Sequence, residues 1–414
     1  MGASLLSRAV RPAAAAAIVG LALVVAGCSG GQSAGSEGLT GSPIIIGSAG
    51  PQTGQANAPE QVQGLQAAVK AVNAAGGIKG HPLQLEYCDT RFDPNTEISC
   101  ARQLVAKNVV ATADAAFTVD ASGTTYKLLD EAKIPEIGNR GSFPASLSSP
   151  YAYLLGGGVP GWYYGNAAAL VNTGAKKVGI IVSPTPAAQY AGQIMAQALQ
   201  SAKVPSTTLT FDPKADPTGQ TTIAKAMAEG VDGVGLAMPQ SSILVLMSAA
   251  QKIGFTGHFA SCGCTLTPTA IASLGAAGNG LMVTSQVALT SDTANPGVAE
   301  YLADLKAADP SFKPTDASLF SWSSVKLFAK IAGNLDTVDK ASVKAAFDAV
   351  STPVDIGTVA PWASHGRTPP SPDWPRVLNP YIQVGIVKNG VVEPDGRGFI
   401  NPFDELTKAA ATTN

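Results

Sequence analysis

Short apolar runs and helical patterns alternate along most of this 414-residue chain. The first unit is an apolar strand over Ile44–Ser48. It is followed by a helix over Glu60–Ala75, in which apolar residues recur at helical spacing until Gly76-Gly77 ends it. A helix between two strands brings the chain back, so that the next strand can run parallel to the first. The alternation therefore predicts a parallel sheet covered by helices on both faces.

The first series of these units extends to residue 138. Its second strand, Leu83–Tyr87, precedes Asp93-Pro94, a pair typical of a helix N-cap followed by a first-turn proline. The series continues with elements over Ala113–Val119, Ala121–Glu131 and Ile134–Gly138.

The pattern restarts after an interruption over Gly138–Gly161. Three strands alternate with three helices, namely Lys177–Val182, Ala187–Leu199, Thr207–Phe211, Thr221–Ala228, Val231–Met238 and Ser241–Ile253. The restart predicts a second doubly wound domain. A mature chain of roughly 370 residues also exceeds what one core usually holds, so two domains are expected.

Two further segments do not fit the alternation. A proline-rich loop over Pro361–Pro380 precedes a hairpin that turns at Asn389-Gly390. Within the interruption, Gly156, Gly158 and Gly161 have the spacing of a dinucleotide fingerprint, but the next strand ends without an acidic residue for a ribose. A glycine-rich crossover between the two domains explains these glycines better.

Residues 1–27 have the pattern of a secretory signal peptide. Arg8 and Arg11 precede an apolar run that is too short to be a comfortable membrane span. Cys28 directly follows Val25-Ala26-Gly27, which resembles the lipobox of bacterial lipoproteins and predicts lipid on Cys28. Residues 28–42 are rich in glycine and serine and predict a flexible tether. We expect an exported protein anchored on the outer face of the cell membrane; the alternative is an ordinary signal with a chance cysteine.

The charge of the mature chain disfavours nucleic acid as a partner. Without Arg8 and Arg11 it has 25 basic and 29 acidic residues, a net charge of about −4. The phosphate backbone of a nucleic acid demands a basic face, which this balance does not supply.

The remaining cysteines fit an oxidising compartment. Cys88, Cys100, Cys262 and Cys264 allow three pairings. Cys88 ends a predicted strand and Cys100 lies one turn into the next helix, so we prefer a bridge between them, which leaves Cys262 to pair with Cys264. Because a Cys-x-Cys bridge is more reducible than most, a redox role or two free thiols stay open.

Several motifs near the start of the mature chain are similar to those of a known family. They are Ile44–Gly47, Gly50–Gly54, Gly64, Ala67–Val69 and Val72–Gly80, of which Asn73–Gly80 is the most specific. The chain resembles the leucine/isoleucine/valine-binding-protein family, the type I solute-binding receptors of ABC importers. The order of strands and helices agrees with this family over nearly the whole mature chain.

The resemblance implies the type I periplasmic binding fold, with two doubly wound α/β lobes of parallel sheet joined by a three-segment hinge. Lobe one would comprise residues 43–157 and 287–351, and lobe two residues 158–286 and 352–414. The implied partners are a small-molecule ligand and an ABC permease and ATPase complex. No cofactor is implied.

Ligands of open parallel sheets bind beyond the carboxyl ends of the strands. The loops at that edge are 50–57, 117–122 and 138–142 in lobe one, and 183–190, 238–241 and 260–265 in lobe two. The resemblance implies that lobe one holds a ligand carboxylate with hydroxyl groups and backbone amides, a role that Thr118, Ser122 and Ser142 could keep. The full set of predicted ligand-binding residues is Thr118, Val119, Asp120, Ser122, Asn139, Arg140, Gly141, Ser142, Trp162, Tyr190, Gln240 and Cys262.

Arg140 is the residue expected to set the charge of the ligand, because a guanidinium offers paired donors to a carboxylate. The alternative is an ion pair, for instance with Asp120. In the resembled family an acidic residue of lobe two meets the α-amino group, but the matching loop, Ala260–Cys264, has no acid. That departure argues against a simple amino acid. Trp162, Tyr190 and Gln240 could contact the ligand or take part in ordinary packing.

Nothing in the sequence predicts catalysis. His81, His258 and His365 have no metal-ligand spacing, so no metal site is predicted, and no nucleophile with a base can be assembled. We expect a non-enzymatic receptor that delivers a small polar ligand, a carboxylate or an amide among the candidates, to an ABC importer. The alternatives are a sensing module for a signalling partner, and a surface thiol-disulfide protein built around Cys262-Gly263-Cys264.

Overall fold

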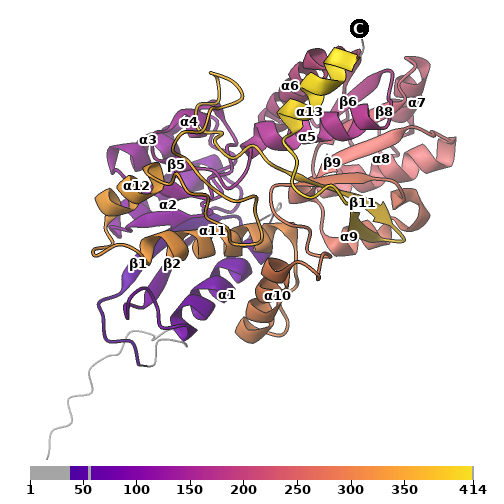
Figure 1. Ribbon diagram of the computed structural model, residues 1–414. Helices are drawn as coiled ribbons and strands as arrows, with labels where there is room; N and C mark the ends of the chain where they lie inside the picture. Colours follow the sequence, from indigo (N-terminus) through magenta and orange to yellow (C-terminus); the bar gives the residue numbers. More distant parts are fainter. Residues whose placement is uncertain (1–37, 55–56, 413–414) are drawn as a thin grey trace, which may run out of the picture. The chain divides into compact units, whose positions relative to one another are not determined.

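The computed structural model describes residues 38–54 and 57–412. Within them the chain forms two β-sheets with helices on their faces (Figure 1), so the predicted α/β fold with two mainly parallel sheets is confirmed. The predicted signal peptide, Cys28 and the tether up to residue 37 lie outside the described residues. Among the described residues, no helix is both long and apolar enough to cross a membrane.

The first sheet has the strand order β2-β1-β3-β4-β5, and all of its strand pairs are parallel. Its strands are β1 (Ile44–Gly50), β2 (Leu83–Asp89), β3 (Ala111–Ala113), β4 (Glu136–Ile137) and β5 (Ala152–Tyr153). The helices between and beside them are α1 (Glu60–Ala74), α2 (Pro94–Ala106), α3 (Thr124–Glu131) and α4 (Pro144–Ser148). Helix α2 begins as predicted, with the Asp93 side chain accepting a hydrogen bond from the Thr96 amide and Pro94 in the first turn.

Strand β3 differs from its prediction. It starts and ends earlier than the expected 113–119, and residues 115–119 form a loop. The break falls at Asp114, whose φ of 45° lies in the left-handed region that an extended strand does not use. The side chain of Asp114 is fully buried, and backbone hydrogen bonds continue past the strand end, from the Asp114 amide to the Ile137 carbonyl and from the Ala116 amide to the Ala49 carbonyl.

Three later helices pack on the first sheet, namely α10 (Pro296–Ala308), α11 (Asp316–Ala332) and α12 (Lys340–Asp348). Helix α11 lies against α1 (Figure 1), and the contact is close at Gly64, where a Cβ would meet the Ser318 carbonyl oxygen at 2.1 Å. Only glycine allows this approach. Trp362, from the segment we expected in lobe two, also lies in this core and donates its indole N–H to the Leu154 carbonyl at 2.8 Å.

The second sheet has the strand order β12-β11-β10-β9-β8-β6-β7. Its strands are β6 (Val178–Val182), β7 (Ser206–Thr210), β8 (Gly233–Ala237), β9 (His258–Cys262), β10 (Met282–Ser285), β11 (Gln383–Lys388) and β12 (Val391–Pro394). Only β11 pairs antiparallel with its neighbours β10 and β12. The hairpin turns at Asn389-Gly390 as predicted, with positive φ at both residues.

Helices cover both faces of the second sheet. Residues of α5 (Gly158–Asn172) and α6 (Pro186–Ser201) form one core with it, and residues of α7 (Gln220–Ala228), α8 (Gln240–Ile253) and α9 (Pro268–Ser273) form another. The C-terminal helix α13 (Pro402–Thr412) packs beside α5 (Figure 1). Short 3₁₀ turns, η1 (Gly263–Thr265) and η2 (Gly275–Gly278), follow β9 and α9.

Chain segments that cross between the sheets are hydrogen-bonded to one another. The Gln286 side chain accepts from the Gly158 amide at 3.0 Å and donates to its carbonyl at 3.1 Å. The Asn379 side chain donates to the carbonyl oxygens of Leu155 and Ala360. The glycines at 156–161 therefore belong to a tightly packed crossover, since Gln286 leaves no room for a side chain at Gly156.

Candidate functional site

The loop after β3 is held in place by a buried carboxylate from α2. Glu97 accepts hydrogen bonds from the amides of Thr118 at 2.7 Å, Val119 at 3.1 Å and Asp120 at 2.8 Å. Burial raises the pKa of Glu97 to about 7, against the opposing effect of these three amides. The backbone amides that we predicted to bind a ligand carboxylate therefore already donate to the carboxylate of Glu97.

Asp120 and Ser122 organise the start of α3. One oxygen of Asp120 accepts from the Ser122 amide and hydroxyl, and the other accepts from the amide and hydroxyl of Thr125 at 2.8 Å each. Burial disfavours ionisation of Asp120, but these hydrogen bonds outweigh it and lower the pKa of its carboxyl. Asp120 and Ser122 are therefore hydrogen-bonded to each other, and Asp120 also to the first turn of α3.

Arg140 forms a buried, two-point ion pair with Asp114. Its Nε and Nη2 donate to the two carboxylate oxygens at 2.8 Å each, and Ser321 of α11 donates to the same carboxylate at 2.6 Å. The guanidinium also lies 4.9 Å from the centre of the Phe320 ring. Burial raises the pKa of Asp114, while Arg140 and Ser321 oppose that shift. Arg140 does form an ion pair, but with Asp114 rather than with Asp120.

Of the other predicted residues in the loop after β4, Asn139 and Gly141 are hydrogen-bonded within the described part of the protein, whereas the Ser142 hydroxyl is not. Asn139 donates to the buried Glu136 at 2.9 Å and accepts from the Gly141 amide at 2.8 Å, which fixes the turn. Ser142 is only 9% exposed and makes no hydrogen bond to another described residue. Its hydroxyl is therefore a free polar group at the carboxyl edge of the first sheet.

The second sheet and its helices carry the remaining predicted residues. Trp162 and Cys262 are buried in one core, and the indole Nε1 of Trp162 has no partner among the described residues. Tyr190 of α6 interacts with Trp374 of the C-terminal segment. Gln240 accepts from the Thr267 amide at 2.9 Å, which ties the start of α8 to the loop after β9.

The structure places Cys88 beside Cys100 and Cys262 beside Cys264, which fits the pairing preferred from the sequence; disulfide formation stays a prediction. Cys262 is 1% exposed, so its sulfur is not presented at the surface. Cys264 is only partly buried, so burial shields one sulfur of the pair and not the other.

Asp316, at the start of α11, is a polar residue of this region that the sequence analysis missed. The hydroxyl of Ser285, the last residue of β10, donates to its carboxylate. A Cβ on Gly263, in the turn after β9, would lie 3.2 Å from the same carboxylate. Asp316 therefore links a helix of the first sheet to the carboxyl end of β10 and lies beside the turn after β9. The sequence signal that could have pointed to Asp316 is the Thr315–Ser318 capping box, which marks the start of its helix.

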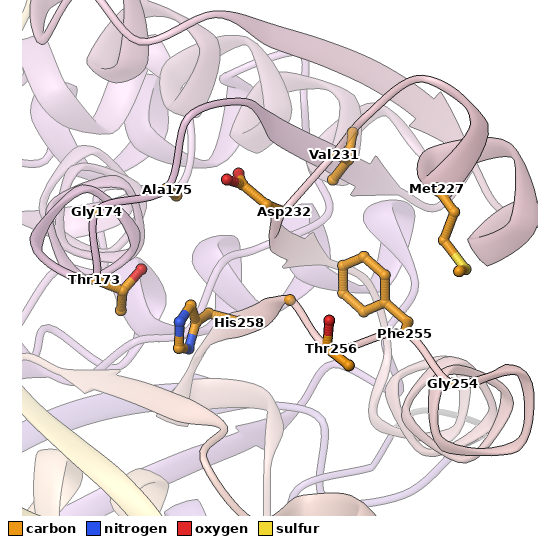
Figure 2. Close-up of a pocket in the computed structure, with 11 residues that line it drawn as sticks. Thr173, Gly174, Ala175, Met227, Val231, Asp232, Gly254, Phe255, Thr256 and His258 are labelled. Carbon is orange, nitrogen blue, oxygen red and sulfur yellow. The ribbon is translucent and has the colours of Figure 1, made fainter.

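A surface cavity of about 330 Å³ lies elsewhere, at the amino ends of β6, β8 and β9. Figure 2 shows Asp232, Phe255 and His258 among the residues that line it. The Asp232 carboxylate is already bonded to the amides of Lys176 and Lys177. Because ligands of parallel sheets bind at the carboxyl ends of the strands, we place the candidate site at the opposite edge from this cavity. Among the described residues, no group of His, Cys, Asp and Glu could hold a metal ion.

The chain belongs to a family of solute-binding receptors. Residues 43–370 match the family described as periplasmic binding protein, which confirms the resemblance drawn from the sequence. No curated protein matches the chain.

Solved structures with the same fold include transporter receptors with different bound ligands. The LivJ branched-chain amino acid transporter substrate binding protein of Streptococcus pneumoniae, in complex with isoleucine, has a TM-score of 0.66 and 18% identity over 85% of this chain and 99% of its own. A solute binding protein of an ABC transporter from Rhodopseudomonas palustris, in complex with p-hydroxybenzoic acid, has a TM-score of 0.70 and 19% identity over 87% and 97%. A fatty acid ABC transporter substrate-binding protein from Thermomonospora curvata has a TM-score of 0.74 and 15% identity over 90% and 95%. At these identities the likeness establishes the fold.

Proposed function

We propose that this protein is an extracytoplasmic receptor that captures a small polar ligand between two lobes and delivers it to the permease and ATPase of an ABC importer. The observation that carries the proposal is the polar cluster of Arg140, Asp114 and Asp316 at the carboxyl edge, in a chain of the periplasmic binding protein family. A ligand there can contact residues from both sheets, because Asp316 is hydrogen-bonded to Ser285.

Capture works through a hinge equilibrium. A ligand that contacts both lobes only in the closed state stabilises that state by its differential binding energy. The crossing segments around Gly158, Gln286 and Asn379 are the proposed hinge, and lipid on Cys28 keeps the receptor at the membrane that holds its importer. Replacing Cys28 by serine should release the protein from the membrane fraction, and continued retention would contradict the anchor.

The test is a thermal-shift screen of the full-length protein in detergent against amino acids, amides, organic acids, amines and sugars. A ligand present at a hundred times its dissociation constant stabilises the folded state by about 2.7 kcal/mol, which moves the melting temperature measurably. A specific hit that loses its effect in Arg140→Ala, in a variant that still melts cooperatively, supports the proposed site. A hit that is insensitive to this substitution places binding elsewhere.

A further inference from the structure

Two buried polar atoms on neighbouring strands of the first sheet have no hydrogen-bond partner among the described residues. They are the hydroxyl oxygen Oγ1 of Thr112 in β3 and the carboxyl oxygen Oε1 of Glu136 in β4. Both residues are 1% exposed. A buried polar group that stays unpartnered costs free energy, and native proteins contain few of them. Two such atoms on adjacent strands point to a shared partner if their side chains face the same way.

The strand register places the two side chains on one face of the sheet. Thr112 and Glu136 are directly paired in the parallel ladder, and the side chains of such a pair point to the same side. Gly47 of β1 is paired with Thr112 on its other side, and a Cβ there would meet Leu104 of α2 at 3.0 Å. Both polar side chains therefore lie on the face that α2 covers, opposite to the face covered by α1 and α11.

A second hydroxyl lies near the carboxyl group of Glu136. Tyr126 of α3 is buried and donates its hydroxyl to the Phe117 carbonyl at 2.7 Å, which leaves its oxygen as an acceptor. Tyr126 is close enough to Glu136 for the two to interact electrostatically. The other groups that act on Glu136 are the Asn139 side chain, which donates to its Oε2 at 2.9 Å, and the carboxylate of Asp130. Among the described residues, no cation is paired with Glu136.

A water molecule fits the donors and acceptors of this group. Burial and the charge of Asp130 raise the pKa of Glu136 to about 8, so its carboxyl is protonated at neutral pH. Because Oε2 accepts from Asn139, the proton lies on Oε1, which then needs an acceptor. A water accepts from Oε1 and donates to the oxygens of Thr112 and Tyr126. Buried waters typically make about three such hydrogen bonds.

We propose that Thr112, Glu136 and Tyr126 bind one buried water molecule inside the first lobe, and that this water positions the loop after β4. The link to the loop is Asn139, whose side chain donates to Glu136 and accepts from the Gly141 amide at 2.8 Å. The water holds the carboxyl group, and the carboxyl group holds the turn that carries predicted ligand-binding residues. The water site goes beyond the proposed receptor function and does not depend on which ligand the receptor takes.

The direct test is a crystal structure of the full-length protein in detergent, at a resolution that shows ordered waters. We expect one water within hydrogen-bond distance of both Thr112 Oγ1 and Glu136 Oε1. A direct hydrogen bond between these two atoms, or no density between them, would overturn the inference. This measurement needs no variant, so it decides the question even if a substitution at Thr112 fails to fold.

Thr112→Val tests the same water through stability, because the two possibilities predict opposite signs. If the hydroxyl were buried without any partner, valine would remove an unfavourable group and the variant would be at least as stable as the parent. If the hydroxyl binds the water, valine removes one of its partners, and the unfolding equilibrium constant in urea at pH 7 should rise at least fivefold. Thr208→Val makes the same change at an exposed position of β7 and should leave that constant within twofold. A Thr112→Val protein as stable as the parent would contradict the water site.

Hydrogen exchange tests the link from the water to the loop. In Thr112→Val the Gly141 amide should exchange at least tenfold faster, since the carboxyl group that holds Asn139 is no longer fixed. The Thr118 amide, which donates to Glu97 at 2.7 Å in the neighbouring loop, is the internal control and should keep its rate. Thr112→Ser retains the hydroxyl and should keep the Gly141 amide protected. An unchanged Gly141 rate in Thr112→Val, or equal acceleration of both amides, would overturn the positioning role.

Discussion

Buried carboxylates organise the carboxyl edge of the first sheet at the scale of single residues. Glu97 holds one loop, Asp114 holds Arg140, and Glu136 holds Asn139. Each ties a loop to the sheet or to a helix packed on it through hydrogen bonds that water cannot replace, because the acids lie inside the protein. Their ionisation is therefore linked to the stability of the fold.

Ionisation of Glu136 should lower the free energy of unfolding as the pH rises. It is 1% exposed, and one of its oxygens has no partner among the described residues. Burial, together with the charge of Asp130, raises its pKa from 4.5 to about 8. Because the folded state then binds its proton more tightly than the unfolded state, stability is full below about pH 4.5 and declines as the pH rises to about 8.

Replacing Glu136 by glutamine removes this titration. Urea unfolding should give similar stabilities for the variant and the parent at pH 5, and a variant more stable by on the order of 2 kcal/mol at pH 8.5. Glu131→Gln, on an exposed part of α3, is the control and should follow the parent at both values. Curves that stay parallel for Glu136→Gln would show that this carboxyl does not titrate in that range.

At the scale of elements, the first turn of α11 holds residues of the polar cluster in position. Thr315 and Ser318 form a capping box, in which the Thr315 hydroxyl accepts from the Ser318 amide at 3.1 Å and the Ser318 hydroxyl accepts from the Thr315 amide at 3.0 Å. This cap fixes the first turn of the helix that carries Asp316, Phe320 and Ser321 to the polar cluster.

Removing the cap should destabilise the protein and disturb the site. Thr315→Ala is expected to cost about 1–2 kcal/mol in urea unfolding, because an orphaned amide remains at the helix start. The affinity for a bound ligand should fall as well, since Asp316 is the first residue of the helix. Thr407→Ala removes a hydroxyl that bonds within the exposed side of α13, and should change neither measurement appreciably. A Thr315→Ala protein as stable as the control would argue against the cap.

At the scale of the whole molecule, the segment after residue 351 contributes to both sheets. Trp362 completes the core of the first sheet, where its ring contacts Tyr153 and Phe347, whereas Trp374 and strand β11 belong to the second. Both cores are therefore incomplete without residues that follow position 351.

Trp362→Ala tests this dependence. It removes a side chain that is 1% exposed together with its hydrogen bond to Leu154, and should lower the free energy of unfolding by about 3–5 kcal/mol. Phe92→Ala removes an aromatic ring that is 46% exposed, and should stay within about 0.5 kcal/mol of the parent. Equal effects of the two substitutions in calorimetry would contradict the role assigned to the C-terminal segment.

The sequence by itself determined the local structure and the class of fold. The Asp93-Pro94 cap and the Asn389-Gly390 turn depend on residues near one another in the chain, and each lies where it was predicted. Strand β3 was predicted too far along the chain. The mostly apolar residues 115–119 have the pattern of a strand, but the observed strand ends before Asp114, whose φ is positive.

Only the tertiary structure decided which polar groups meet. Asp114 and Asp120 are both acids of the same loop, and the sequence could not show that Arg140 pairs with the first of them. Ser321 reaches Asp114 across 207 positions of sequence, and Asp316 meets Ser285 through contact of α11 with the end of another sheet. The physical reason is that a buried charge without a partner is unfavourable, so buried charges are found paired. Strand order and helix packing decide which partner is within reach.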